Sequence, residues 1–150
     1  MTAGDALARA LATADGAIIG REVIDSQLLS QCTNLKVVSL YGVGHDNINL
    51  SDMEKAGVTF SMAEGVNSQF AAEHTIGLIL SLLRNIQITS EKLKQEEWFK
   101  NGGVSLINRT VGIVGAGNVG SKVARVVKAL GAKILICDII DKKALCTEFD

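Results

Sequence analysis

Short apolar runs alternate with stretches of helical periodicity along the first part of the chain. Buried strands are predicted at residues 17–19, 35–40 and 58–60. Amphipathic helices are predicted at residues 7–14, 26–32 and 50–56. In the second helix Leu28 and Leu29 are expected to point inward, and Gly57 is expected to end the third. Regular alternation of strands and helices predicts a parallel, doubly wound α/β sheet.

The most apolar helical pattern lies in the middle of the chain, where one long helix is predicted over residues 68–86. Its apolar stripe consists of Ala72, Ile76, Ile79, Leu83 and Ile86, widened by Leu78 and Leu82. A helix with so broad an apolar surface is expected to lie between two layers or two subunits. A polar helix carrying Trp98 is predicted over residues 90–99, followed by a break at Asn101, Gly102 and Gly103.

A strand, a glycine-rich turn, a helix and a second strand are predicted over residues 110–138. The strands are expected at residues 110–114 and 133–137. Between them, Gly115, Gly117 and Gly120 have the spacing G-x-G-x-x-G. The core stripe of the helix is expected to be Val119, Val123, Val127 and Leu130, with Lys122, Arg125 and Lys128 on the other face and Gly131 at its end.

This pattern predicts a dinucleotide site. Gly115 permits a tight turn, Gly117 lets a pyrophosphate approach the backbone, and Gly120 lets the helix pack on the strand. The helix start at Asn118, Val119 and Gly120 offers backbone amides and a positive dipole end to phosphate. Asp138, eighteen residues after Gly120, is expected to bind ribose hydroxyls.

Asp138 favours NAD over NADP, because a carboxylate repels a 2′-phosphate. Lys142 and Lys143 follow closely and would weaken this preference. The alternative interpretation is a glycine turn in an α/β protein that binds no nucleotide.

Bulk properties narrow the class of protein. The 150 residues carry a net charge of −1, which gives no indication of a nucleic-acid or membrane surface. No apolar run approaches the roughly 18 residues of a transmembrane helix. Cys32, Cys137 and Cys146 are odd in number and widely spaced, which favours reduced thiols in the cytoplasm over disulfides or a metal site. Cys137 is expected to be packed inside its strand. Proline is absent, and we have no physical account of this.

With these residues placed, the chain resembles the NAD-dependent D-2-hydroxyacid dehydrogenases, a family that includes phosphoglycerate dehydrogenase and erythronate-4-phosphate dehydrogenase. The resemblance covers about residues 7–141. The motifs that carry it are residues 34–38 (NLKVV), 41–49 (YGVGHDNIN), 65–67 (GVN), 72–75 (AEHT), 84–86 (RNI), Trp98 and the segment 110–138. Many members have proline where Glu64 and Ile139 stand, which puts the shape of the loop before Asn67 in doubt.

The resemblance implies a fragment of a longer fold. Residues 1–66 would form part of a flavodoxin-like substrate domain. Residues 67–150, including the long linking helix, would form the first half of a Rossmann NAD-binding domain. The long helix and Trp98 resemble the family's dimerisation region, which implies a homodimer.

The resemblance also implies a substrate site. The main-chain amides of Gly42, Val43 and Gly44 would hold the carboxylate of a small 2-hydroxy acid, and glycines suit such an anion nest. Asn67 would line the cleft between the domains, and Thr75 would lie near the nicotinamide. The alternatives are a plain glycine turn at residues 42–44 and a helix N-cap at Asn67. Arg21 could meet a substrate phosphate, but a solvated surface arginine is the favoured interpretation.

The family's reaction is reversible hydride transfer between a 2-hydroxy acid and NAD. Its catalytic histidine, acidic residue and arginine map beyond residue 150, so no catalytic residue is predicted here and the chain alone is expected to be inactive. His74 lies within the long helix beside Glu73 and is expected to be structural. The rival hypotheses are a non-enzymatic NAD sensor resembling corepressors of this fold, and a degenerate remnant.

Overall fold

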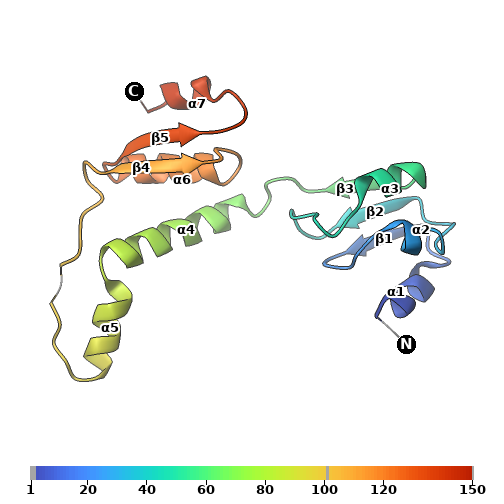
Figure 1. Cartoon of the computed structure of the whole chain (residues 1–150), viewed down its shortest axis with the longest axis horizontal. Coiled ribbons are helices and arrows are strands. Elements are labelled where there is room, and N and C mark those ends of the chain that lie inside the picture. Colours follow the sequence, from blue (N-terminus) through green and yellow to red (C-terminus); the bar gives the residue numbers. More distant parts are fainter. Residues whose placement is uncertain (1–2, 101, 150) are drawn as a thin grey trace. The chain divides into compact units, whose positions relative to one another are not determined.

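The computed structural model describes residues 3–100 and 102–149. Asn101, predicted to lie in the break after the helix over residues 90–99, is outside these ranges. The chain forms two compact units, Met1–Val66 (the N-terminal unit) and Asn67–Asp150 (the C-terminal unit). Both contain parallel strands connected through helices (Figure 1). The predicted α/β class with parallel sheets is confirmed. None of the helices in the described ranges has the length and apolar character needed to span a bilayer.

The N-terminal unit is a three-stranded parallel sheet with β2 in the centre. Its strands are β1 (Gly16–Ile19), β2 (Val37–Leu40) and β3 (Thr59–Met62). Its helices are α1 (Ala3–Leu11), α2 (Ser26–Leu29) and α3 (Leu50–Lys55). Ile19, Leu40 and Met62 are in register at the ends of the strands, so the loops that follow the strands leave the sheet at one edge.

The core of the N-terminal unit is built from Ile24, Val38 and Met53, which are almost completely buried. Leu28 and Leu29 are buried as predicted. Helix α2 is shorter than predicted, since it ends at Leu29, and α1, Ala3–Leu11, begins and ends earlier in the chain than predicted. The Asp25 carboxylate caps the start of α2 by accepting from the Leu28 amide at 2.9 Å.

The C-terminal unit combines a two-stranded parallel sheet with the remaining helices. These elements are α4 (Ser68–Leu83), α5 (Ile86–Lys94), β4 (Thr110–Val114), α6 (Gly120–Ala129), β5 (Lys133–Cys137) and α7 (Lys143–Thr147). Both strands have the predicted bounds. The helix α6 packs on β4 and β5 and also against α4. The core contains Ala72, Ile113, Val123, Ala124 and Val127.

The prediction of one helix over residues 68–86 is wrong at its C-terminal end, because α4 ends at Leu83 and a second helix, α5, begins at Ile86. Asn85 adopts a left-handed conformation (φ 55°) between α4 and α5. The Leu83 carbonyl, which would accept from the amide four residues later in a continuing helix, accepts from the Val104 amide at 2.8 Å. Gly103 makes this approach possible: a Cβ there would lie 2.1 Å from the Leu83 oxygen.

The predicted helix over residues 90–99 is also misplaced. Helix α5 ends at Lys94, and Glu96 then adopts a left-handed conformation (φ 62°) that turns the chain before Trp98. Trp98 therefore lies outside any helix.

Several apolar side chains are more exposed than predicted. Ile76, Ile79 and Leu83 pack against the core of the C-terminal unit, whereas Leu78 and Leu82 are 59% and 79% exposed. The stripe on α4 is thus narrower than its sequence suggested. Three other residues expected inside are also exposed: Ile86, Leu130 and Cys137.

Replacing Gly103 by alanine is expected to lower the free energy of unfolding by about 1–3 kcal/mol, because the new methyl group would collide with the Leu83 carbonyl. The neighbouring Gly102→Ala is the matched control, since no atom lies within 4 Å of a Cβ there. It should change stability by no more than about 0.5 kcal/mol. Urea unfolding followed by circular dichroism measures both, and equal stabilities of the two variants would contradict this account.

Candidate functional site

The turn between β4 and α6, residues 115–120, contains three glycines in different environments. Gly115 has φ +85°, which favours glycine, and its amide donates to the Cys137 carbonyl at 2.8 Å. A Cβ on Gly120 would lie 2.0 Å from the Gly115 oxygen, so only glycine lets α6 start this close to β4. A Cβ on Gly117 would meet no atom within 4 Å. The backbone conformation therefore explains Gly115 and close packing explains Gly120, whereas the side of the turn at Gly117 is open.

The start of α6 suits an anion. Val119 occupies the N-cap position and forms no side-chain capping hydrogen bond, and the first turn carries no acidic residue. Backbone amides in the first turn of a helix lack intrahelical acceptors and lie at the positive end of the helix dipole. Asn118, Val119 and Gly120 therefore form a start that favours a phosphate over a cation.

Asp138 follows β5 and is hydrogen-bonded to the glycine turn. Its Oδ2 accepts from the Ala116 amide at 2.7 Å, although the two residues are 22 positions apart, and its Oδ1 accepts from the Ile140 amide at 3.0 Å. These two hydrogen bonds, first that from Ile140, lower the pKa of Asp138. The carboxylate is therefore ionised at neutral pH, and its bonds are lost only when the pH falls through that lowered pKa.

Sequence reasoning assigned Asp138 to a ribose and missed its bond to the turn. No local signal could have revealed that bond, because it joins two segments that only the parallel pairing of β4 with β5 brings together. An ionised carboxylate offers about four acceptor positions, more than the amide hydrogen bonds to Asp138 occupy. The residues present therefore fit a dinucleotide: an approachable backbone at Gly117, a helix start for the pyrophosphate, and an ionised acceptor beside both.

The loop at residues 42–46 follows β2, the central strand of the N-terminal unit. Ligands of open α/β sheets bind beyond the carboxyl ends of the strands, where this loop lies. The Tyr41 amide donates to the Ile19 carbonyl at 2.8 Å, and the side-chain amide of Asn47 donates to the Glu22 carbonyl at 2.6 Å. The segment containing Gly42, Val43 and Gly44 is therefore held at both ends.

His45 lies in the same loop. Its ring lies against Phe60, with centroids 5.8 Å apart, and its buried Nδ1 has no hydrogen-bond partner. Phe60, on β3, is the residue that sequence reasoning missed, because the contact depends on the pairing of β2 with β3.

The remaining predicted site residues, Asn67 and Thr75, lie in the C-terminal unit. Asn67 is exposed at the N-cap position of α4, the position that the alternative interpretation gave it, although its side chain forms no capping hydrogen bond. The Thr75 hydroxyl donates to the Ala71 carbonyl within α4 at 2.8 Å. His74 is exposed. Arg21, at the carboxyl end of β1 in the N-terminal unit, is exposed as well.

Metal chemistry finds no support in the described ranges, 3–100 and 102–149. They contain no cluster of three or more histidine, cysteine, aspartate or glutamate side chains that could hold an ion. Cys32, Cys137 and Cys146 are free thiols.

Comparison with known proteins agrees with the geometry. Residues 76–149 match the model of the D-isomer specific 2-hydroxyacid dehydrogenase NAD binding domain. The chain is 36% identical to a D-3-phosphoglycerate dehydrogenase of Bacillus subtilis, over 77% of this chain and 22% of that protein. It is 34% identical to a glyoxylate reductase of Thermofilum pendens, over 77% of this chain and 36% of the relative. It thus spans only about a fifth to a third of these relatives' length.

A solved structure extends the match to most of the chain. It is a D-lactate dehydrogenase from Aquifex aeolicus, complexed with NAD and lactic acid. It superposes with a TM-score of 0.87 and 26% identity, over 94% of this chain and 44% of that one. The chain belongs to the D-isomer-specific 2-hydroxyacid dehydrogenase family.

Proposed function

We propose that this protein is an NAD-dependent oxidoreductase that transfers hydride between NAD(H) and a small 2-hydroxy or 2-keto acid. The observation that carries the proposal is the glycine turn at the start of α6, open at Gly117 and hydrogen-bonded to the ionised Asp138. The relatives support the reaction class, since they are named as dehydrogenases and a reductase of small acids.

The C-terminal unit would bind the cofactor. Gly115, Gly117, Asn118, Val119 and Gly120 would form the pyrophosphate site, since the turn is open where a phosphate would approach. Asp138 would accept hydrogen bonds from the ribose hydroxyls with its remaining acceptor positions, and Thr75 would lie on the nicotinamide side. NAD, once bound, supplies the hydride acceptor.

The N-terminal unit would belong to the substrate domain. The amides of Gly42, Val43 and Gly44 would hold the substrate carboxylate, supported by the anchoring of this loop at the carboxyl edge of the sheet. Asn67 would line the substrate cleft. Free thiols at all three cysteines support a reducing, cytoplasmic location.

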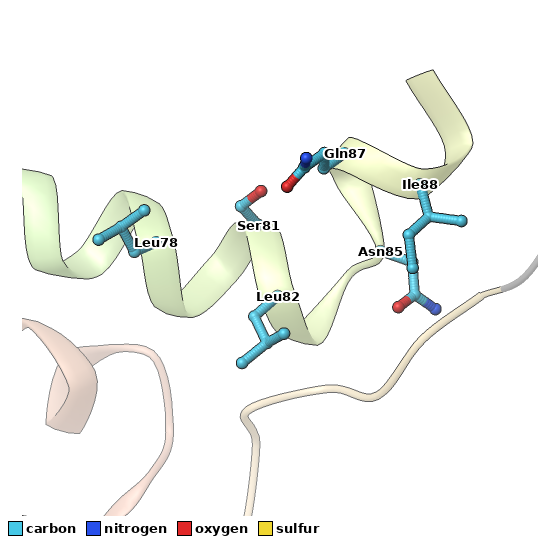
Figure 2. Close-up of a pocket in the computed structure, with 6 residues that line it drawn as sticks. All are labelled: Leu78, Ser81, Leu82, Asn85, Gln87 and Ile88. Carbon is cyan, nitrogen blue, oxygen red and sulfur yellow. The ribbon is translucent and has the colours of Figure 1, made fainter. Parts of the chain in front are cut away.

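An apolar surface on α4 and α5 supports a homodimer. Leu78 and Leu82 on α4, and Ile88 on α5, are exposed, as is Trp98, which is 82% exposed. Exposed apolar patches of this kind mark interaction surfaces. Figure 2 shows the residues that line a hollow of about 330 Å³ at the junction of the two helices: Leu78, Ser81, Leu82, Asn85, Gln87 and Ile88.

Cofactor binding is tested by titrating the full chain with NADH and following nicotinamide fluorescence. Gly117→Ala is expected to weaken NADH binding at least about tenfold, because its methyl group would fill the open side of the turn without touching the protein. Urea unfolding of the same variant should match that of the unmodified chain. No binding at millimolar NADH would refute the cofactor assignment.

Activity is tested with the protein at its full natural length, by NADH formation from glycerate, phosphoglycerate, phosphoerythronate and lactate. Turnover of at least one acid is expected. The 150-residue chain should be slower by at least about 10²-fold, because general acid/base groups alone contribute about 10²–10⁴ and none is assigned within it. Binding of NADH by the full-length protein without turnover of any 2-hydroxy acid would favour a non-enzymatic NAD sensor.

The dimer is tested by the mass of the full chain in light scattering after gel filtration. Leu82→Glu should shift the protein to monomer, because it places a charge in the apolar surface of α4. Val23→Glu, an exposed position in the N-terminal unit, is the matched control and should leave the mass unchanged. A monomeric unmodified protein would rule the homodimer out.

A further inference from the structure

The geometry points to Lys142 as the residue that tunes the choice between NAD and NADP at this site. The inference rests on the proposed function, because it concerns the dinucleotide that Asp138 and the glycine turn would bind. It assigns to Lys142, and not to the adjacent Lys143, a direct electrostatic influence on the cofactor's ribose end.

Asp138 and Lys142 form a partly buried ion pair. The Lys142 Nζ lies 3.7 Å from the Asp138 Oδ2, and the two side chains are only 24% and 9% exposed. The other groups that act on this carboxylate are the backbone amides of Ile140, Ala116 and Ile139, which carry no net charge. Lys142 therefore supplies the positive charge beside the acid that would bind the ribose.

Backbone structure holds Lys142 in this place. The Ile140 amide donates back to the Asp138 Oδ1, which folds the chain just after β5. The Lys142 carbonyl then accepts from the Cys146 amide at 2.9 Å, at the start of α7. This course of the backbone places the side chain of Lys142, four positions after Asp138, beside the Asp138 carboxylate.

Lys143 is a different case, although it is the next residue. Its ammonium group lies 3.4 Å from Asp141, and its side chain is 91% exposed. Its charge is largely screened by solvent and counterions. Lys142 and Lys143 therefore allow a matched comparison, because the charge of Lys142 lies beside Asp138 and the charge of Lys143 does not.

The consequence concerns the 2′-phosphate of NADP. An isolated carboxylate at the ribose position would repel this group strongly, whereas an ammonium group 3.7 Å away offsets part of that repulsion. NAD has a neutral hydroxyl there and is affected less. Lys142 should therefore narrow the preference for NAD, and its removal should widen it.

The test measures NADH and NADPH dissociation constants by nicotinamide fluorescence on the full chain. In Lys142→Met the ratio of the NADPH constant to the NADH constant should rise roughly three- to tenfold. Lys143→Met should leave the ratio unchanged, and Lys142→Arg should restore it. The increase in Lys142→Met should shrink at high salt. Asp138→Asn should lower the ratio, because it removes the repelling charge.

The outcomes separate this inference from the proposed function. Binding of NADH with the same ratio in Lys142→Met and Lys143→Met would overturn the role of Lys142 alone. Equal weakening of both dinucleotides in Lys142→Met would also overturn it, because a merely structural residue has that effect. Failure of the unmodified chain to bind either dinucleotide would overturn the proposed function and this inference together.

Discussion

The hydrogen bond from the Ala116 amide to the Asp138 carboxylate is the interaction on which the proposed cofactor site depends. It joins the end of β4 to the end of β5 and keeps the glycine turn beside an ionised acid. The close approach of Gly120 to the Gly115 carbonyl adds the start of α6 to the turn and the acid, because it lets the helix pack directly on β4. Turn, helix start and acid are thereby assembled by backbone contacts, and the open side at Gly117 is left for a ligand.

The same kind of backbone anchoring organises the loop in the N-terminal unit. Tyr41 connects it to Ile19 at the end of β1, Asn47 connects it to Glu22 in the segment that follows β1, and His45 lies against Phe60 of β3. The three neighbouring strands therefore all contribute to the shape of one loop. Because the loop is held at its ends, the amides between them are presented without a large loss of conformational freedom on binding.

The electrostatics of the cofactor site follow from its neutral and charged partners together. Backbone amides, first that of Ile140, lower the pKa of Asp138 and keep its charge, and the positive charge of Lys142, in a partly buried position, acts in the same direction and balances it. The net charge of such a site depends on Lys142 as well as on Asp138, which the G-x-G-x-x-G spacing alone does not indicate. In the proposed site the preference between NAD and NADP is then a property of the Asp138–Lys142 ion pair.

The sequence by itself determined the elements whose causes are local. The strands β4 and β5, the glycine spacing, the inward Leu28 and Leu29, and the stop at Gly57 all follow from periodicity or from single-residue conformational preferences. Tertiary structure decided what depends on distant partners. The Val104 amide donates to the Leu83 carbonyl and ends α4, the Ala116 amide donates to the Asp138 carboxylate, and Phe60 packs against the His45 ring. Such contacts leave no periodic trace in the sequence, since each forms only after the strands and helices have packed.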